Sequence, residues 1–288
     1  MRLSLAAASL GVLLVVGCGR VDGGATTIVS PPGSALVLWQ FFPADQYPRP
    51  IVWFENRSPV NGFSSNDGKI AAICSRFKPV IPLPNQVPPQ ALATWTDGTS
   101  LVYPAISVAD AYAAMSRSTG ATSPDCSSVP PLVITAARLG LFDFYTDRGT
   151  VQMTSWMFTA TGANGEFAYP AVARSAFWSG GMTTHSSNGG AGISVDGRSL
   201  TWTFAGAHDH PGPCGADYQG VVAESRTAVA IVLQVFRHAA PNEPVACDTM
   251  AEVRSVTVTL ASPLGGRVVV DAEGNAATVC RTGLSGGC

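Results

Sequence analysis

The sequence has few charged side chains and almost no lysine. Charged residues make up 12% of the 288 residues, against about a quarter in an ordinary globular domain. Only two lysines, Lys69 and Lys78, accompany fifteen arginines, and the formal net charge is −2. With no basic surface of any size, the composition argues against a nucleic-acid partner.

The first seventeen residues have the pattern of a secretory signal. Arg2 gives a positive start, and residues 3–16 are almost entirely apolar but too short to span a bilayer. This stretch ends in Val-Val-Gly-Cys at residues 15–18, which resembles the lipobox of bacterial lipoproteins. The resemblance implies cleavage after Gly17 and acylation of Cys18, including palmitate. An ordinary signal peptide with an incidental cysteine is the alternative.

A lipid at Cys18 implies a membrane-anchored protein. Two acyl chains anchor stably where one binds only marginally, so the mature chain is expected on the extracytoplasmic face of the cell membrane. Residues 18–34 are rich in Gly, Ser, Thr and Pro, which predicts a flexible tether. Cleavage leaves sixteen basic and nineteen acidic residues, a mild net charge of −3.

The sequence also lacks close cysteine pairs of the C-x-x-C kind, which argues against a zinc site. Six cysteines follow Cys18, and an even number in an exported chain indicates disulfides. Fifteen connectivities are possible for six cysteines. Pairing neighbours along the chain gives Cys74 with Cys126, Cys214 with Cys247 and Cys280 with Cys288.

Glycine and proline are abundant, at 30 and 21 residues, and β-branched residues alternate with polar ones in many short stretches. This composition favours short strands joined by turns. We expect a mainly β fold of antiparallel, sandwich-like sheets. Strands or hairpins are predicted over residues 36–42, 51–55, 69–77, 93–103, 141–158, 195–205, 228–236, 255–260 and 268–270.

One segment predicts a helix, near residues 107–116. Ser107 can cap its start, and Asp110 follows three residues later as in a capping box. The next stretch is a Ser-, Thr-, Gly- and Pro-rich loop, where we place a soft boundary. It separates an N-terminal β region, 35–130, from a C-terminal β domain, 131–288. One large β domain is the alternative.

The second half resembles a group of actinobacterial secreted lipoproteins of unknown function, over roughly residues 133–271. The resemblance is carried by residues 146–149 with 155–158, 194–200, 214–225 and 258–271. It implies an envelope location and a disulfide between Cys214 and Cys247. It implies no reaction.

The best candidate for a metal site is His208-Asp209-His210. Histidines at i and i+2 of a strand face the same way, which is how some metal sites in β proteins begin. However, Pro211 ends any strand there, and Cys214 is better explained by a disulfide. An exposed polar loop explains His208 and His210 at least as well. No metal or cofactor is therefore expected.

No residue is assigned a catalytic role. Aromatic residues are crowded near residues 39–54 and 156–178, where they indicate either core or a ligand platform. We expect a non-catalytic envelope module that binds a wall component, a small ligand or another protein. The alternative is a secreted hydrolase acting on cell-wall or extracellular substrate.

Overall fold

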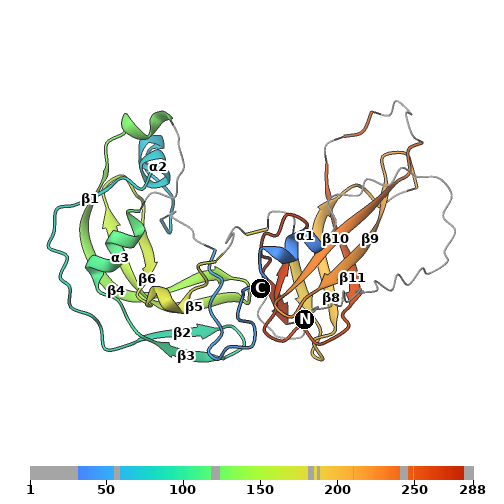
Figure 1. Ribbon diagram of the computed structural model, residues 1–288. Helices are drawn as coiled ribbons and strands as arrows, with labels where there is room; N and C mark the ends of the chain where they lie inside the picture. The colour runs from blue at the N-terminus through green and yellow to red at the C-terminus, as the bar shows by residue number, and fades with distance from the viewer. Residues whose placement is uncertain are drawn as a thin grey trace, which may run out of the picture.

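The structure is a computed structural model that describes residues 32–54, 59–117, 124–180, 185–186, 189–209, 211–240, 246–248 and 250–281. The signal sequence, Cys18, His210 and Cys288 lie outside these residues, as does most of the expected tether. Figure 1 shows two β lobes side by side. The prediction of a mainly β fold is confirmed.

The first lobe is built on a six-stranded sheet. Its strands are β1 (Phe77–Pro79), β2 (Ala91–Trp95), β3 (Ser100–Tyr103), β4 (Leu132–Thr146), β5 (Gly149–Ala160) and β6 (Glu166–Pro170). The order is β1-β4-β5-β2-β3, with β6 also on β5, and all pairs except β1 with β4 are antiparallel. Helices α2 (Asn66–Ile73) and α3 (Val108–Met115) pack against the sheet around the buried Phe158 and Phe167.

The long hairpin of β4 and β5 ends in a tight turn at the second lobe. Thr146 pairs with Gly149, so only Asp147 and Arg148 form the turn. The Thr146 hydroxyl donates to the Gly149 carbonyl at 2.7 Å and accepts from the Arg148 N–H at 3.2 Å. Gly149 has φ +88°, a conformation that side chains rarely adopt. Local sequence therefore fixes where Asp147 and Arg148 lie.

The second lobe is a sandwich of two sheets. One has the order β11 (Glu252–Thr259), β8 (Ser199–Gly206), β7 (Gly190–Ile193), β13 (Val279–Arg281), and the other β12 (Val268–Val270), β10 (Ala228–Arg237), β9 (Ala216–Glu224). Leu200 and Trp202 of β8 meet Val229 and Ile231 of β10 in one buried cluster. Alternating apolar residues along β8 place these side chains in the core.

The first described segment of the chain joins the lobes. It begins with α1 (Pro32–Val37), which packs on β9 and β10 of the second lobe (Figure 1). Trp39 and Phe42 are buried in a cluster with Val268 and Val270. The segment then reaches the first lobe, where Ile51 belongs to a cluster with residues of β2 and β5.

Two of the expected disulfides are formed, and each lies within one lobe. Cys74 is bonded to Cys126 in the first lobe and Cys214 to Cys247 in the second. Cys280 is also disulfide-bonded, but its expected partner Cys288 lies outside the described residues. In the chain-entropy model each closed loop stabilises the fold by about 4 kcal/mol.

Most of the predicted β segments contain strands. The hairpin expected at 93–103 is formed by β2 and β3, and the one expected at 141–158 lies within β4 and β5. The helix near 107–116 is α3, with the capping box as expected. Ser107 Oγ accepts from the Asp110 N–H at 3.1 Å and donates to the Asp110 carboxylate at 2.7 Å.

Three strand predictions were wrong. Residues 51–54 form no strand but only isolated bridges, from Ile51 to Phe177 and from Trp53 to Thr146, and residue 55 lies outside the described residues. Residues 69–77 lie mostly in α2, because Ser65 caps that helix by accepting from the Gly68 N–H and because Ala71 and Ala72 fill its buried face. Residues 36–42 end α1 and continue into turns. Ala35, Trp39 and Phe42 are buried, and their spacing of four and three positions is that of one helix face. Phe41, which would alternate with them only in a strand, is 81% exposed.

The six-stranded sheet takes strands from both sides of the boundary placed near residue 130, since β1 to β3 precede it and β4 to β6 follow it. Strands β1 to β6 belong to the first lobe and strands β7 to β13 to the second, so the chain passes from one lobe to the other between β6 and β7. Among the described residues, no helix has the length and apolar character needed to cross a membrane.

Candidate functional site

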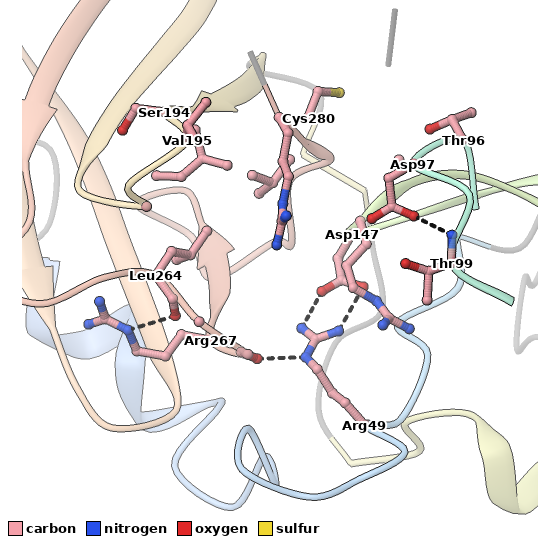
Figure 2. A pocket seen from close by; sticks show the side chains of 18 residues that line it. Arg49, Thr96, Asp97, Thr99, Asp147, Ser194, Val195, Leu264, Arg267 and Cys280 are labelled. Carbon is pink, nitrogen blue, oxygen red and sulfur yellow. Dashed lines mark hydrogen bonds and ion pairs between the residues drawn. The ribbon is translucent and has the colours of Figure 1, made fainter. Parts of the chain in front are cut away.

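A cavity of about 330 Å³ lies where the two lobes meet (Figure 2). The first lobe contributes the turns between β2 and β3 and between β4 and β5, and the second contributes two loops and β13. The lining residues are Arg49, Thr96, Asp97, Thr99, Asp147, Arg148, Gly149, Ile193, Ser194, Val195, Gly197, Leu264, Gly265, Gly266, Arg267, Val279, Cys280 and Arg281. Segments far apart in sequence thus build one site.

A buried ion pair between Arg49 and Asp147 forms one wall. The side chains are 8% and 2% exposed, and both carboxylate oxygens accept from the guanidinium (Figure 2). Arg49 Nε also donates to the Gly266 carbonyl at 2.6 Å. The Asp147 carbonyl accepts from the Val279 N–H at 2.9 Å. The turn of the first lobe is therefore bonded directly to the second.

Close backbone contact at Gly266 tightens the same wall. A Cβ at this position would lie 2.0 Å from the Ala44 carbonyl oxygen. Only glycine allows this approach, so residue 266 has to be glycine for the segment around Ala44 to reach the loop.

A second ion pair makes the loop at 261–267 rigid. Arg267, which is 9% exposed, donates to Glu224 at 2.7 Å and to the carbonyls of Ser262, Pro263 and Leu264. Burial acts to raise the pKa of Glu224, but hydrogen bonds from Ala261 and Arg267 and the charge of Arg267 lower it overall. Arg267 is thus fully used in holding the loop.

Arg148 is the cavity's unusual side chain. Its guanidinium lies over the ring of Trp95, 4.3 Å from the centroid. Nε and Nη2 are buried. Burial raises the pKa of Tyr103, while the charge of Arg148 and a side-chain hydrogen bond with it act to lower that pKa. Burial lowers the pKa of Arg148, although neighbouring Asp147 acts to raise it. A guanidinium keeps its charge in such surroundings.

Asp97 and Arg281 lie at the cavity's more exposed side. Asp97 accepts from the Thr99 N–H at 2.9 Å (Figure 2). Burial acts to raise the pKa of Asp97, but the Thr99 hydrogen bonds and the charges of Arg281 and Arg148 lower it overall. Of the four arginines in the lining, Arg49 and Arg267 are neutralised by ion pairs. The other two, Arg148 and Arg281, carry two positive charges against the single negative charge of Asp97 in the lining.

The His208 candidate lies elsewhere in the second lobe. His208 Nδ1 is 2.7 Å from Glu252 and Nε2 is 3.0 Å from Asp248. Both hydrogen bonds raise the pKa of His208. His210 lies outside the described residues, and within the described part of the chain no group of three or more His, Cys, Asp or Glu side chains could hold a metal ion.

Two short matches to serine-nucleophile motifs occur in the sequence. Residues 283–287, Gly-Leu-Ser-Gly-Gly, lie outside the described residues. Ser75-Arg76-Phe77-Lys78 matches S-x-x-K, a spacing that brings the two side chains together on a helix. Here Ser75 is buried just beyond α2, with φ +56°, while Lys78 is exposed on β1. This match therefore lacks the helical arrangement.

Comparison of the chain with protein-family models, with curated proteins and with solved structures finds no match. Sequence reasoning identified the turn at 146–149 as part of a hairpin and not as part of a site. Nothing in the spacing of Arg49, Asp97, Asp147 and Gly266 indicates that they meet, because tertiary packing alone brings them together.

Proposed function

We propose that the protein is a lipid-anchored, extracytoplasmic binding module that holds a small ligand in the cavity between its lobes. The observation that carries this proposal is the cavity itself, a concave site between the two lobes with several charged side chains in its lining. Ligand sites are concave, largely pre-formed and often placed at such junctions.

The cavity walls are held in place without a ligand. The Arg49–Asp147 and Arg267–Glu224 ion pairs fix two of its loops, and the Asp147 carbonyl ties the hairpin turn to Val279. A pre-organised site avoids the free energy of ordering loops on binding. These contacts support a binding role.

The side chains in the lining favour binding over catalysis. Among the described lining residues there is no histidine or lysine, and Cys280 is disulfide-bonded. Asp147 accepts from Arg49 through both oxygens and is therefore poorly placed as a base. The lipobox at residues 15–18 and the cysteine pairing support an exported, membrane-anchored protein.

Thermal unfolding with and without candidate ligands tests the proposal. The full chain is heated with the small-molecule fraction of bacterial envelopes and with a panel of sugars, amino acids and short peptides. A ligand at a hundred times its dissociation constant should raise the midpoint by about 5 to 10 °C.

Two matched variants place the ligand. Val195 lines the cavity and is 90% exposed, so Val195→Trp should fill the cavity without disturbing the fold. Val253 of β11 is 82% exposed and does not line the cavity, so Val253→Trp is the control. The shift should disappear in the first variant and persist in the second. An equal shift in both variants contradicts the proposal.

A further inference from the structure

Three exposed apolar side chains lie close together near the start of the described chain. Val37, Leu38 and Phe41 are 58%, 41% and 81% exposed. Their spacing of one and three positions places them on one side of α1 and of the hydrogen-bonded turns that follow it. We call these three residues the α1 patch. Apolar side chains that are exposed as a group indicate an interaction surface.

The opposite side of the same segment is buried, which explains why the α1 patch faces outward. Ala35 and Trp39 belong to a cluster with Ala230 of β10. Ile231, the next residue of β10, belongs to the core of the sandwich. Successive side chains of a strand point to opposite faces of the sheet. The segment therefore covers the outer face of the sheet β12-β10-β9, and the α1 patch points away from that sheet (Figure 1).

The place of the α1 patch in the chain points to a lipid bilayer as its partner. Thirteen residues, 19–31, separate Cys18 from Pro32, where α1 begins. A flexible chain of this length has a root-mean-square end-to-end distance of about 20 Å. Acyl chains on Cys18 would therefore hold the α1 patch beside the membrane at a high effective concentration.

The charges around the α1 patch fit the same partner. From Gly23 to Ala44 the sequence has no charged side chain, so this segment can approach the apolar part of a bilayer without desolvating a charge. Leu38 packs beside Gly274, and the adjacent Glu273 is exposed. A carboxylate at this place gives no attraction to anionic lipid. Apolar contact is therefore the force that would hold the α1 patch on a membrane.

We propose that the α1 patch docks on the extracytoplasmic surface of the membrane that holds the Cys18 lipid, with Phe41 inserted among the acyl chains. This inference rests on the anchoring in the proposed function and goes beyond it, because it gives the folded domain a membrane-binding surface of its own. Three side chains bind a bilayer weakly, so docking depends on the lipid at Cys18. Since α1 packs on β9 and β10, docking would fix the second lobe against the membrane.

Quenching of tryptophan fluorescence by lipids with brominated acyl chains tests the docking. The lipidated full chain with Phe41→Trp is placed in phosphatidylcholine vesicles with and without bromine, and the signal of the unchanged protein is subtracted. The introduced indole should lose fluorescence when bromine is present. Val253→Trp is the matched control, because Val253 is 82% exposed on β11, in the other sheet of the sandwich. Its indole should keep its fluorescence.

A charge placed in the α1 patch tests the apolar contact. Val37→Asp, added to the Phe41→Trp protein, should abolish the quenching because a carboxylate enters a bilayer at high cost. Val253→Asp changes the net charge equally and should leave the quenching in place. Both positions are exposed, and thermal midpoints show whether both variants fold. Equal quenching of the two introduced indoles, or quenching that Val37→Asp leaves unchanged, contradicts the inference. Quenching only in vesicles of anionic phosphatidylglycerol overturns it as well.

Failure of the docking can be distinguished from failure of the proposed function. The mass of the N-terminal peptide shows whether Cys18 is lipidated. If it is not, the proposed anchoring fails and the docking fails with it. If Cys18 is lipidated and the indole of Phe41→Trp is not quenched, only the docking is wrong. A blue shift of that indole with rising concentration of Cys18→Ala protein, without lipid, would assign the α1 patch to a second copy of the chain and also overturn the inference.

Discussion

Arg49 and Asp147 are the most deeply buried ion pair in the described part of the chain. Removing one partner of a buried pair leaves the other charge without compensation, which typically costs about 3 to 5 kcal/mol. The pair also links the lobes, because Arg49 donates to Gly266 of the second lobe. We therefore expect Asp147→Ala to lower the free energy of unfolding by about that amount in urea titrations.

The exposed Arg138–Glu166 pair provides the comparison. Its side chains are 62% and 24% exposed, and solvent screening leaves exposed pairs with little effect on stability. Glu166→Ala should therefore change stability only slightly. Similar losses in the two variants would contradict the structural role given to Asp147.

For single residues, the sequence shows which chemical groups are present but not which other residues they will contact. Ser107 and Asp110 could be predicted as a capping box because they are three positions apart. Arg49 and Asp147 are separated by 98 positions, and no local pattern relates them. Residues that meet through tertiary packing are therefore the ones that sequence reasoning missed.

The loop at 264–267 depends on one glycine for its position. A methyl group at Gly266 would meet the Ala44 carbonyl at 2.0 Å, and overpacking of this kind costs about 1 to 3 kcal/mol. Gly266→Ala should destabilise the protein by this amount and weaken ligand binding, as measured by urea unfolding and titration calorimetry.

Gly33 gives the opposite expectation. It lies in α1 with nothing within 4 Å of the position of a Cβ. Gly33→Ala should raise the free energy of unfolding by about 0.5 to 1 kcal/mol, because alanine favours a helix over glycine. A loss of stability in this variant would contradict a helical conformation at residue 33.

The connection of residues 207–209 to 248–252 should depend on pH. Hydrogen bonds to Glu252 and Asp248 raise the pKa of His208 above 6.5, while burial lowers that of His185 below it. Hydrogen bonds from His208 and Asp209 lower the pKa of Glu252. The contact is therefore fully formed between the lowered pKa of Glu252 and the raised pKa of His208, and is lost as pH rises through the latter.

Imidazole NMR signals check this expectation. His208 should titrate above the ordinary value and His185 below it, and Glu252→Gln should bring the midpoint of His208 down. If His208 titrates at its ordinary pKa in the unchanged protein, the contact with Glu252 and Asp248 is absent in solution.

Elements with local signals could be predicted, and those set by long-range pairing could not. The hairpins within residues 93–103 and 141–158 were predicted because tight turns need particular residues, here Asp97-Gly98 and Asp147-Arg148-Gly149. The parallel pairs β1 with β4, β10 with β12 and β7 with β13 have no such turn. Helix α2 was mistaken for a strand because its short apolar run fits either structure.

At the scale of the whole molecule, the mainly β class followed from composition, whereas the cavity did not. It needs the hairpin turn of one lobe and the loops of the other, and no single stretch of sequence contains both. The lipid anchor stays a prediction from residues 15–18, which precede the described chain.

Replacing Cys18 separates anchoring from folding. Cys18→Ala removes the acylated thiol, so the protein should shift from the membrane to the soluble fraction on cell fractionation. The thermal midpoint should stay unchanged, because residue 18 belongs to the stretch whose composition predicts a flexible tether. Persistent membrane association of this variant would contradict lipidation at Cys18.

The contact between Trp39 and Gly274, a residue made late, has a consequence for the timing of folding. The Trp39 indole donates to the Gly274 carbonyl at 2.9 Å, across 235 positions, and its ring is buried beside Phe42, Val268 and Val270. Until these late residues have been made, Trp39 and Phe42 lack much of the surface that buries them. At about 5 to 20 residues per second, synthesis of the intervening chain takes about 10 to 50 s. A segment that is made early is therefore among the last to be buried.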